Sequence, residues 1–396
     1  MKFDVFHSLS RSDAITPRLG DREVFEHFLS QLKLSESLQF SCMWIAESHF
    51  SSETQKRHPN AVIPNYLGEV GLNADSMQLL QLAMAQTQNI DFGTAIHNIV
   101  GGSGGPIASA DRVRSLIFLN DLQSRPRNIY LGFAAGRFPY INRPFGIFAR
   151  DEWEQKFWPE TQRAIFLEAT EIFLRLSLGQ ILESEAIAEL PLEPGFFRSQ
   201  EDYEEASKLR ICFARRWVFD CMSLVPQLSK QQLDRLHFVL GSHDPLAQKK
   251  ALSFTDIDLF NLSFTPPSQI NSAHSAMAKL CSDFGRKTWN RGRMPRTVLV
   301  FIDSSRKKAQ ELADRVISTY IEAMRGTVQL PPKDVLLERA LIGDPAEIVE
   351  QLQPDHPKSF HKDDRIMLWF EFNQSDNNEI RHQMKLFAEQ VIPRLS

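Results

Sequence analysis

Residues 90–134 read IDFGTAIHNIVGGSGGPIASADRVRSLIFLNDLQSRPRNIYLGFA, and this stretch decides the fold class. Its two ends, 90–96 and 128–134, are short apolar runs rich in β-branched and aromatic residues, whereas residues 108–122 carry apolar side chains at helical spacing. A strand, a helix and a second strand in this order are typical of a parallel βαβ unit, because parallel neighbours need a long crossover connection.

The same alternation recurs along the chain and predicts eight strands. Their apolar content is nearly continuous, which suits strands that are covered on both faces. We expect strands at residues 2–7, 41–47, 90–96, 128–134, 237–242, 257–263, 296–302 and 365–371. We expect helices at residues 22–38, 75–88, 108–122, 304–325 and 377–395, the first two with Asp21 and Asp75 as N-caps.

Eight strands with helical connections predict an α/β fold, a single (β/α)8 TIM barrel. An open, doubly wound sheet is the competing arrangement, because pattern alone does not show closure. The connection from Gly136 to Leu236 is far longer than the others. It predicts a large insertion, residues 150–235, between strands four and five of one domain that spans residues 1–396. Within the insertion we expect a long helix at 152–178, a loop at 190–200 and a short hairpin at 215–228.

The composition is that of an ordinary folded protein and excludes collagen, disorder and coiled coil, with 42% hydrophobic and 24% charged residues. Forty-five basic and 49 acidic residues leave a net charge of -4, which indicates no nucleic-acid or anionic-membrane partner. The four cysteines form no C-x-x-C pair, the start MKFDVFHSLSRSD lacks a signal-peptide core, and no apolar run reaches membrane length. We therefore expect a cytoplasmic protein without a membrane segment.

In a barrel of this type the active site forms at the carboxyl ends of the strands, and the side chains expected there are unusually polar. For any single His or Ser, satisfying a backbone group is the more common role, so only the cluster points to a site. The strand-end residues are His7, Ser8, Glu47, Ser48, His49, Thr94, His97, Gly136, Arg137, Ser242, His243 and Glu371.

Other motifs narrow the chemistry. There is no H-E-x-x-H and no close histidine pair on one helix face, so no metal site is predicted. Residues 100–112, VGGSGGPIASADR, match neither phosphate-loop fingerprint and are interpreted as a flexible loop over the barrel mouth. Residues 242–245, Ser-His-Asp-Pro, are a better anion site, because N–H groups at a helix start and a Ser hydroxyl could hold a phosphate. A polar rim around an apolar interior suits a flat aromatic cofactor.

Several collinear motifs resemble the bacterial-luciferase-like family of flavin-dependent monooxygenases. The start MKFDVF is similar to the family's first strand, and MWIAESHF at 43–50 is similar to its apolar run ending in E-H-H-F. IDFGTAI at 90–96 resembles the third-strand motif, and residues 109–136 resemble the helix and fourth strand that follow. RPFGI at 143–147, LIGDPAEIVEQL at 341–352 and MKLFAEQVIPRL at 384–395 continue the match in the same order.

The resemblance implies a (β/α)8 barrel that binds reduced flavin mononucleotide (FMN) or, in some branches, a deazaflavin. It implies that Glu47 lies beside the flavin, that the backbone of residues 94–96 supports the ring with a non-proline cis peptide between Ala95 and Ile96, and that residues 241–243 hold the phosphate. The implied flavin-binding residues are Glu47, Thr94, Ala95, Ile96, Ala134, Gly136, Arg137, Gly241, Ser242 and His243.

Two residues depart from the family pattern. Ser48 stands where relatives carry the first histidine of E-H-H-F, so that its acid or base role passes to His49 or His97 or is not required. Ser48, His49 and His97 are therefore the catalytic candidates. Ala135 stands where some relatives carry an arginine that contacts the phosphate, so that either Arg137 compensates or the phosphate is held less tightly.

The resemblance implies a monooxygenase that uses reduced FMN and O2 to oxygenate an apolar organic substrate. It further implies a separate flavin reductase and a homodimer. One alternative is a deazaflavin-dependent oxidoreductase on the same barrel. The other, motivated by Ser48 and Ala135, is a flavin-binding or partner protein that has lost catalysis.

Overall fold

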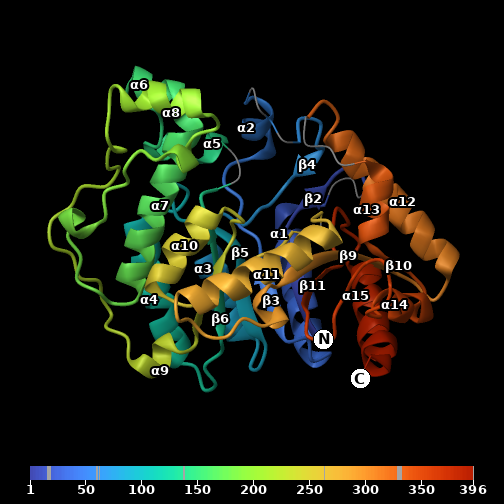
Figure 1. Cartoon of the computed structure of the whole chain (residues 1–396). Coiled ribbons are helices and arrows are strands. Elements are labelled where there is room, and N and C mark those ends of the chain that lie inside the picture. The colour runs from blue at the N-terminus through green and yellow to red at the C-terminus, as the bar shows by residue number, and fades with distance from the viewer. Residues whose placement is uncertain are drawn as a thin grey trace.

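The computed structural model describes residues 1–15, 19–58, 61, 63–136, 139–262, 264–327 and 332–395. The fold is α/β, a nine-stranded sheet with helices packed around it (Figure 1). The strands are β1 (Lys2–His7), β3 (Cys42–Ile45), β5 (Asp91–Asn98), β6 (Ile129–Ala134), β7 (Leu236–Leu240), β8 (Ile257–Leu259), β9 (Arg296–Ile302), β10 (Leu341–Gly343) and β11 (Arg365–Trp369). All neighbouring pairs in this sheet are parallel.

The eight predicted strands are confirmed, two of them, β1 and β9, with the predicted bounds. The prediction at 257–263 reaches residue 263, which lies outside the described residues. Sequence reasoning missed β10, whose three residues carry too little pattern to be recognised. It also missed the antiparallel pair of β2 (Arg11–Ser12) and β4 (Gly68–Glu69).

The strand order is the one expected for a (β/α)8 barrel. The sheet runs β10-β9-β11-β1-β3-β5-β6-β7-β8, so that all strands but β10 follow one another in chain order around β1. Asn261, directly after β8, forms a parallel bridge with Arg296 of β9. The N–H of Asn261 donates to the carbonyl of Pro295 (3.0 Å), and the N–H of Thr297 donates to the carbonyl of Asn261 (3.1 Å). These hydrogen bonds link the segment after β8, at one end of the strand order, to β9, which is next to the other end.

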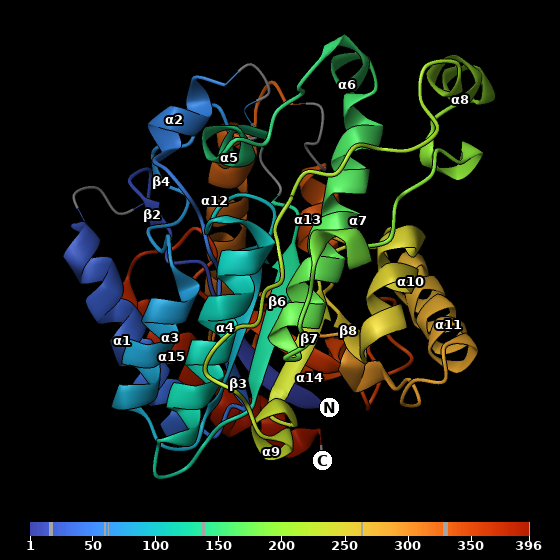
Figure 2. The same ribbon diagram turned by 90° about the vertical axis from the view of Figure 1, so that its left-hand side faces the viewer.

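Helices cover the outside of the sheet (Figures 1 and 2). They are α1 (Asp21–Ser37), α2 (Ser52–Lys56), α3 (Ser76–Gln86), α4 (Gly105–Asp121), α5 (Pro139–Asn142), α6 (Glu152–Lys156), α7 (Trp158–Ser177), α8 (Gln200–Ser207), α9 (Lys230–Leu233), α10 (Pro245–Phe254), α11 (Pro267–Asp283), α12 (Arg306–Ala323), α13 (Lys333–Arg339), α14 (Pro345–Gln351) and α15 (Asn377–Leu386). The helical conformation after α15 continues as a π segment and a 3-10 turn to residue 394.

The predicted helices are present, and one of the two predicted N-cap residues is confirmed. Asp75 caps α3 as predicted, because its side chain accepts from the second and third N–H groups of the helix. The prediction for Asp21 is wrong, since Gly20 is the N-cap of α1. The Asp21 carboxylate pairs with Arg11 instead, and the Glu23 carboxylate accepts from the Gly20 N–H at 2.7 Å.

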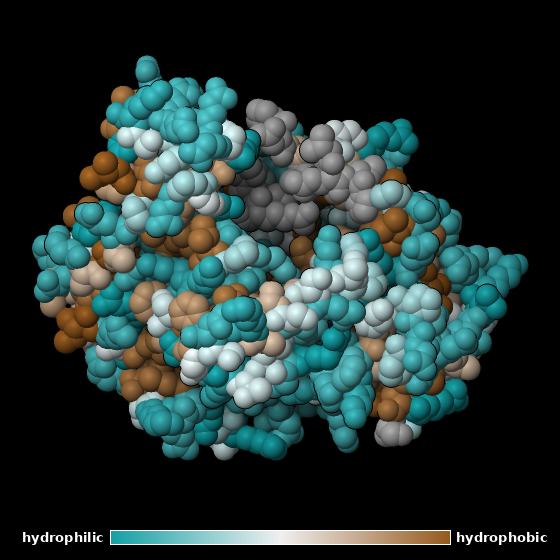
Figure 3. All heavy atoms as spheres, viewed as in Figure 1, coloured by the Kyte–Doolittle hydropathy of each residue, from teal (hydrophilic) through white to brown (hydrophobic). Residues whose placement is uncertain are grey.

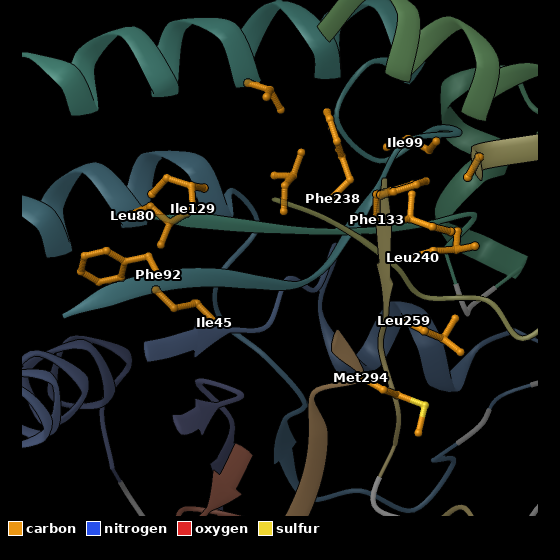
Figure 4. Packing of buried hydrophobic residues seen from close by; sticks show 14 of the residues in the cluster. Ile45, Leu80, Phe92, Ile99, Ile129, Phe133, Phe238, Leu240, Leu259 and Met294 are labelled. Atoms are coloured by element: carbon orange, nitrogen blue, oxygen red, sulfur yellow. The ribbon is translucent and has the colours of Figure 1, made fainter. Parts of the chain in front are cut away.

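Two clusters of buried side chains occupy the two faces of the strands, because successive strand residues point to opposite sides. Outward residues such as Ile45, Phe92 and Ile129 pack with Leu80 and other helix residues in the main core (Figure 4). Each fully buried side chain of this kind contributes about 1.5–3 kcal/mol. Six strands supply inward residues to a smaller cluster, so the sheet curves around a shared interior. Its members are Phe6, Cys42, Trp44, Ala95, Tyr130, Val239, Phe260 and Met367.

The interior also holds a buried ion pair. The guanidinium of Arg365 on β11 donates through Nε to Asp4 Oδ2 on β1 at 2.5 Å, and Trp44 Nε1 donates to the same oxygen at 2.7 Å. The guanidinium lies 3.8 Å from the centre of the Tyr130 ring. Side chains from β11, β1, β3 and β6 thus meet in one polar group inside the sheet.

The long connection between β6 and β7 differs from its prediction in two places. The expected single helix at 152–178 is broken at Phe157 into α6 and α7. Pro159, in the first turn of α7, has no N–H with which to continue a helix from α6.

The hairpin predicted at 215–228 is wrong. This segment contains no strand, only an isolated bridge at Met222. The N–H groups of Arg216 and Trp217 donate to the Glu168 carboxylate of α7 at 2.9 and 3.1 Å. A helix side chain, rather than a partner strand, satisfies the backbone here.

The molecular surface is mostly hydrophilic on the face drawn in Figure 3, with hydrophobic side chains gathered toward the insertion at the left. The most exposed large hydrophobic side chains of the described residues belong to the insertion: Leu209, Ile211 and Val218. In the described ranges, no helix combines the length and apolar character required to cross a membrane.

Candidate active site

The strand-end polar residues gather around the Glu47 carboxylate. Glu47 lies two residues after the end of β3, and its side chain is only 1% exposed. Oε2 lies 2.9 Å from Nδ1 of His97, near the end of the neighbouring strand β5. Oε1 lies 3.1 Å from Nε2 of His49, two residues further along the chain. One buried carboxylate therefore holds two of the three predicted catalytic residues.

A serine is a further hydrogen-bond donor to Glu47. The Ser76 hydroxyl, at the start of α3, donates to Oε2 at 2.7 Å. Burial alone would raise the pKa of Glu47, but the charge of His97 and the hydrogen bonds from His49, His97 and Ser76 hold this pKa well below its ordinary value of 4.5. Glu47 is an anion at neutral pH, although it lies in the interior.

His97 is enclosed on all sides. Its ring has no exposed surface, and its second nitrogen, Nε2, lies 2.9 Å from the Ser109 hydroxyl on α4. Both ring nitrogens are thus occupied by the protein. His97 orients Glu47 in this arrangement and does not present a nitrogen to a bound molecule.

His49 lies closer to the surface, against the glycine-rich loop. A Cβ on Gly102 would come within 2.8 Å of His49 Cδ2, so the backbone of this loop rests directly on the imidazole. The ring of Phe145 lies 6.4 Å from that of His49. Part of the loop predicted at 100–112 covers this side, but its residues from Gly105 onward belong to α4.

Ser48 lies apart from this cluster. Its N–H donates to the carbonyl of Asn73 at 2.9 Å, and its Cβ packs against Gly71. No hydrogen bond joins Ser48 to Glu47 within the part of the chain that the structure describes. The structure therefore brings His49 and His97 together and leaves Ser48 outside.

Ala95, Ile96, Ala134 and Gly241, called the floor below, lie together at the ends of β5, β6 and β7. The peptide between Ala95 and Ile96 is cis, at the predicted position, and the Thr94 hydroxyl donates to the carbonyl of Gly132 at 2.9 Å. A Cβ on Gly241 would run into the side chain of Ile96 and lie 3.2 Å from Cβ of Ala134. Ala95, Ile96, Ala134 and Gly241 are thereby adjacent on three neighbouring strand ends.

The end of β6 is tied to the Glu47 cluster by asparagines. Gly136 has a φ of +82°, and a Cβ there would lie 2.6 Å from Nδ2 of Asn98. That amide nitrogen donates to Oδ1 of Asn142 at 2.7 Å, and Asn142 Nδ2 donates to the carbonyl of Ala135 at 2.8 Å. The predicted residue Arg137 lies outside the described residues.

The end of β7 carries free donors. The Ser242 hydroxyl accepts from the Asp244 N–H at 3.2 Å, and Asp244 caps α10 by accepting from Leu246 at 3.0 Å. The N–H groups of Ser242 and His243 donate to no acceptor among the described residues. Arg163 of α7 donates through Nε to Oδ2 of Asp244 at 2.9 Å.

The chain matches the family model described as luciferase-like monooxygenase over residues 1–356. It belongs to the luciferase-like monooxygenase family. This is a family of oxidoreductase enzymes, and the predicted flavoprotein class is confirmed at that level. No curated protein sequence matches the chain.

Solved structures of luciferase-like enzymes share the fold over the full chain. Monooxygenase RslO1 from Streptomyces bottropensis has 17% sequence identity and a TM-score of 0.68, with 100% of both chains covered. The oxygenating constituent of 3,6-diketocamphane monooxygenase of Pseudomonas putida, a type II Baeyer–Villiger enzyme in complex with FMN, has 14% identity and a TM-score of 0.64, with 99% of this chain and 98% of that chain covered.

An F420-dependent secondary alcohol dehydrogenase, in complex with an F420–acetone adduct, is similar at 13% identity and a TM-score of 0.55, with 100% of this chain and 99% of that one covered. At these identities the likeness shows the fold alone. A flavin-type cofactor is supported for the family, and its exact identity is not fixed by these comparisons.

Sequence reasoning missed several residues of this candidate site. Ser76 and Ser109 hold Glu47 and His97, and Asn98 and Asn142 join β5 to the end of β6. Ser76, Ser109 and Asn142 lie away from the predicted strand ends, and Asn98, two residues after the predicted strand 90–96, was passed over beside His97. The described residues contain no group of three or more His, Cys, Asp or Glu side chains arranged to hold a metal ion.

A second buried carboxylate, Glu371, stands at the end of β11. It accepts from the N–H of Ser8, from Trp369 Nε1 at 3.1 Å and from the Ser10 hydroxyl at 3.4 Å. His7 lies 3.5 Å from it. Burial lowers the pKa of His7, and its Nδ1 accepts from the Leu9 N–H, so this imidazole stays neutral at pH 7.

Proposed function

We propose that this protein is the oxygenating component of a flavin-dependent monooxygenase, which uses reduced FMN and O2 to oxygenate an apolar organic substrate. The observation that carries the proposal is the anionic, fully hydrogen-bonded Glu47 cluster beside a floor of small residues at the strand ends. A separate reductase would supply the reduced flavin. A homodimer is proposed on the family resemblance.

The residues present fit a flavin. The side chain of Ile96 lies against Gly241 and Ala134, and a Cβ at position 241 would displace it, so Gly241 keeps Ile96 in place as part of a surface for a flat ring. Free N–H groups at 242 and 243 suit a phosphate, because backbone donors at a helix start bind anions well. These residues would hold FMN, and when bound in its reduced form it would supply the electrons for oxygen activation.

The protein's own contribution is orientation, charge and exclusion of water. Glu47 fixes the ring of His49 and places a negative charge behind it, so His49 can hold a proton at its other nitrogen, Nδ1, next to a bound molecule. His97 and Ser109 fix Glu47 from the far side. The loop backbone at Gly102 covers His49 and limits the access of water to it.

The test is a titration with oxidised and with anaerobically reduced FMN, followed by admission of oxygen while its consumption is measured. The proposal expects binding of the reduced form and consumption of O2 that rises when an oxidisable apolar substrate is added. Binding of F420 with no O2 consumption would replace the proposal by a deazaflavin oxidoreductase. FMN binding without turnover of any offered substrate would favour a protein that has lost catalysis.

A pair of glycine variants localises the site. Gly241→Ala places a methyl group against Ile96 and is expected to weaken FMN binding about tenfold or more. Gly195→Ala is the matched control, because a Cβ there meets nothing within 4 Å. Equal FMN affinity in the two variants would show that the floor around position 241 does not receive the cofactor.

A further inference from the structure

The insertion helix α7 delivers a cation to the end of β7, where the resemblance places the flavin phosphate. Arg163 reaches Asp244, and Asp244 also holds Ser242 through the hydrogen bond from its N–H to the Ser242 hydroxyl. The guanidinium and the Ser242 hydroxyl are therefore both bound to one residue. The family position that carries an arginine in some relatives is Ala135 here, and Arg137 lies outside the described residues, so Arg163 is a cation that the described residues offer at this strand end.

The guanidinium of Arg163 has hydrogen-bond donors that the described residues do not use. It has five N–H bonds. Nε is used by Asp244 at 2.9 Å, and Nη1 donates to the carbonyls of Gly195 and Phe196, each at 3.2 Å. Nη2 has no acceptor among the described residues. The carbonyl contacts hold the plane of the guanidinium in place, and its remaining edge is free to bind.

The charges at this place favour an anion only if Arg163 is present. Asp244 alone would repel a phosphate, because both carry negative charge at neutral pH. Arg163 compensates the Asp244 carboxylate and adds directed donors to the free N–H groups of Ser242 and His243. The Arg163 side chain is 38% exposed and the Asp244 side chain 23%, so a ligand can reach both from solvent.

We propose that Arg163 is a phosphate-binding residue of the flavin site, contributed by the insertion in place of the family arginine at the Ala135 position. This inference rests on the proposed function. It goes further by assigning a cofactor role to the insertion and by making FMN, rather than riboflavin, the preferred flavin. Arg163 acts on the phosphate and on Asp244, and it has no contact with the Glu47 cluster.

The experiment compares two ligands that differ only by the phosphate. Binding of FMN and of riboflavin to the full chain is measured by fluorescence quenching for the unchanged protein and for Arg163→Met. The substitution is expected to weaken FMN at least tenfold and to change riboflavin less than twofold. Arg163→Lys, which keeps the charge and loses the planar fork, is expected to recover part of the FMN affinity. Added salt should weaken FMN binding to the unchanged protein more than to Arg163→Met.

Arg175→Met is the matched control, since Arg175 lies on the same helix and pairs with Glu171 at 2.8 Å. It should leave the FMN-to-riboflavin ratio unchanged. An equal loss of both flavins in Arg163→Met, or no loss of either, would overturn the inference while the proposed function stands. Failure of the unchanged protein to bind either flavin would overturn the proposed function and this inference with it.

Discussion

Replacing Glu47 by glutamine tests whether its negative charge holds the site together. The Glu47→Gln side chain keeps the shape but has one acceptor oxygen in place of two. The NH2 group of the glutamine would then lie opposite hydrogen-bond donors of Ser76, His97 and His49, where the second carboxylate oxygen had accepted. Hydrogen bonds to a buried charge are worth about 1.5–3 kcal/mol each, so the free energy of unfolding at pH 7 should fall by about 2–4 kcal/mol.

The pH dependence of this loss is the sharper test. The pKa of Glu47 in the folded protein lies well below its ordinary value of 4.5, so unfolding is accompanied by proton uptake when the pH is below 4.5. The stabilisation by this carboxylate is therefore complete above pH 4.5 and is lost as the pH falls toward the folded pKa. With 1.36 kcal/mol per pKa unit, about 1.4 kcal/mol should be gone at pH 3.5.

The assay is urea denaturation of both proteins at pH 7 and pH 3.5. The difference in unfolding free energy between the unchanged protein and Glu47→Gln should shrink by about 1.4 kcal/mol between these pH values. Other carboxylates cancel in this difference. Glu26→Gln, at an exposed position on α1 paired with Arg22, is the control and should show no comparable change. A difference that stays constant between pH 7 and 3.5 would refute the reasoning.

Two further predictions concern the frame around the site. Arg365→Met should lower the free energy of unfolding by about 3–5 kcal/mol, because it leaves the Asp4 carboxylate charged and unpaired inside the sheet. Urea denaturation measures this free energy, and a loss below about 1 kcal/mol would contradict the prediction. Gly136→Ala should lower the unfolding free energy by about 1–3 kcal/mol, because φ is +82° there and the added methyl meets Asn98; thermal melting measures it, and an unchanged melting temperature would speak against the described contact.

The sheet could be predicted because its strands are buried on both faces and read as continuous apolar runs. The runs at 2–7 and 296–302 matched β1 and β9 residue for residue. The same rule failed at 215–228, where an apolar run covers α7 without forming a strand. Glu168 accepts from the N–H groups of Arg216 and Trp217 in this segment, and no local sequence pattern indicates that a helix carboxylate will take this role.

Sequence reasoning identified the site residues at the strand ends, but it missed the residues that form hydrogen bonds with them. Glu47, His49 and His97 could be placed at one edge because parallel strands end together, and the cis peptide at Ala95–Ile96 followed from the family resemblance. The separation of Ser48 from this cluster could not be predicted. Beyond the end of a strand, the direction of each side chain depends on the conformation of the loop, which the sequence pattern does not show.

The missed partners share a position that a sequence search can include. In a (β/α) fold the carboxyl end of each strand lies next to the start of the following helix, so hydroxyls in the first helical turns are as near to the site as strand-end residues. Ser76 is the first residue of α3, and Ser109 is the fifth of α4. The same search would also return Ser52 of α2, whose hydroxyl accepts from the Val70 N–H instead of binding Glu47. Position alone thus identifies the candidates, and only side-chain direction separates those that hold the carboxylate from those that hold a backbone group.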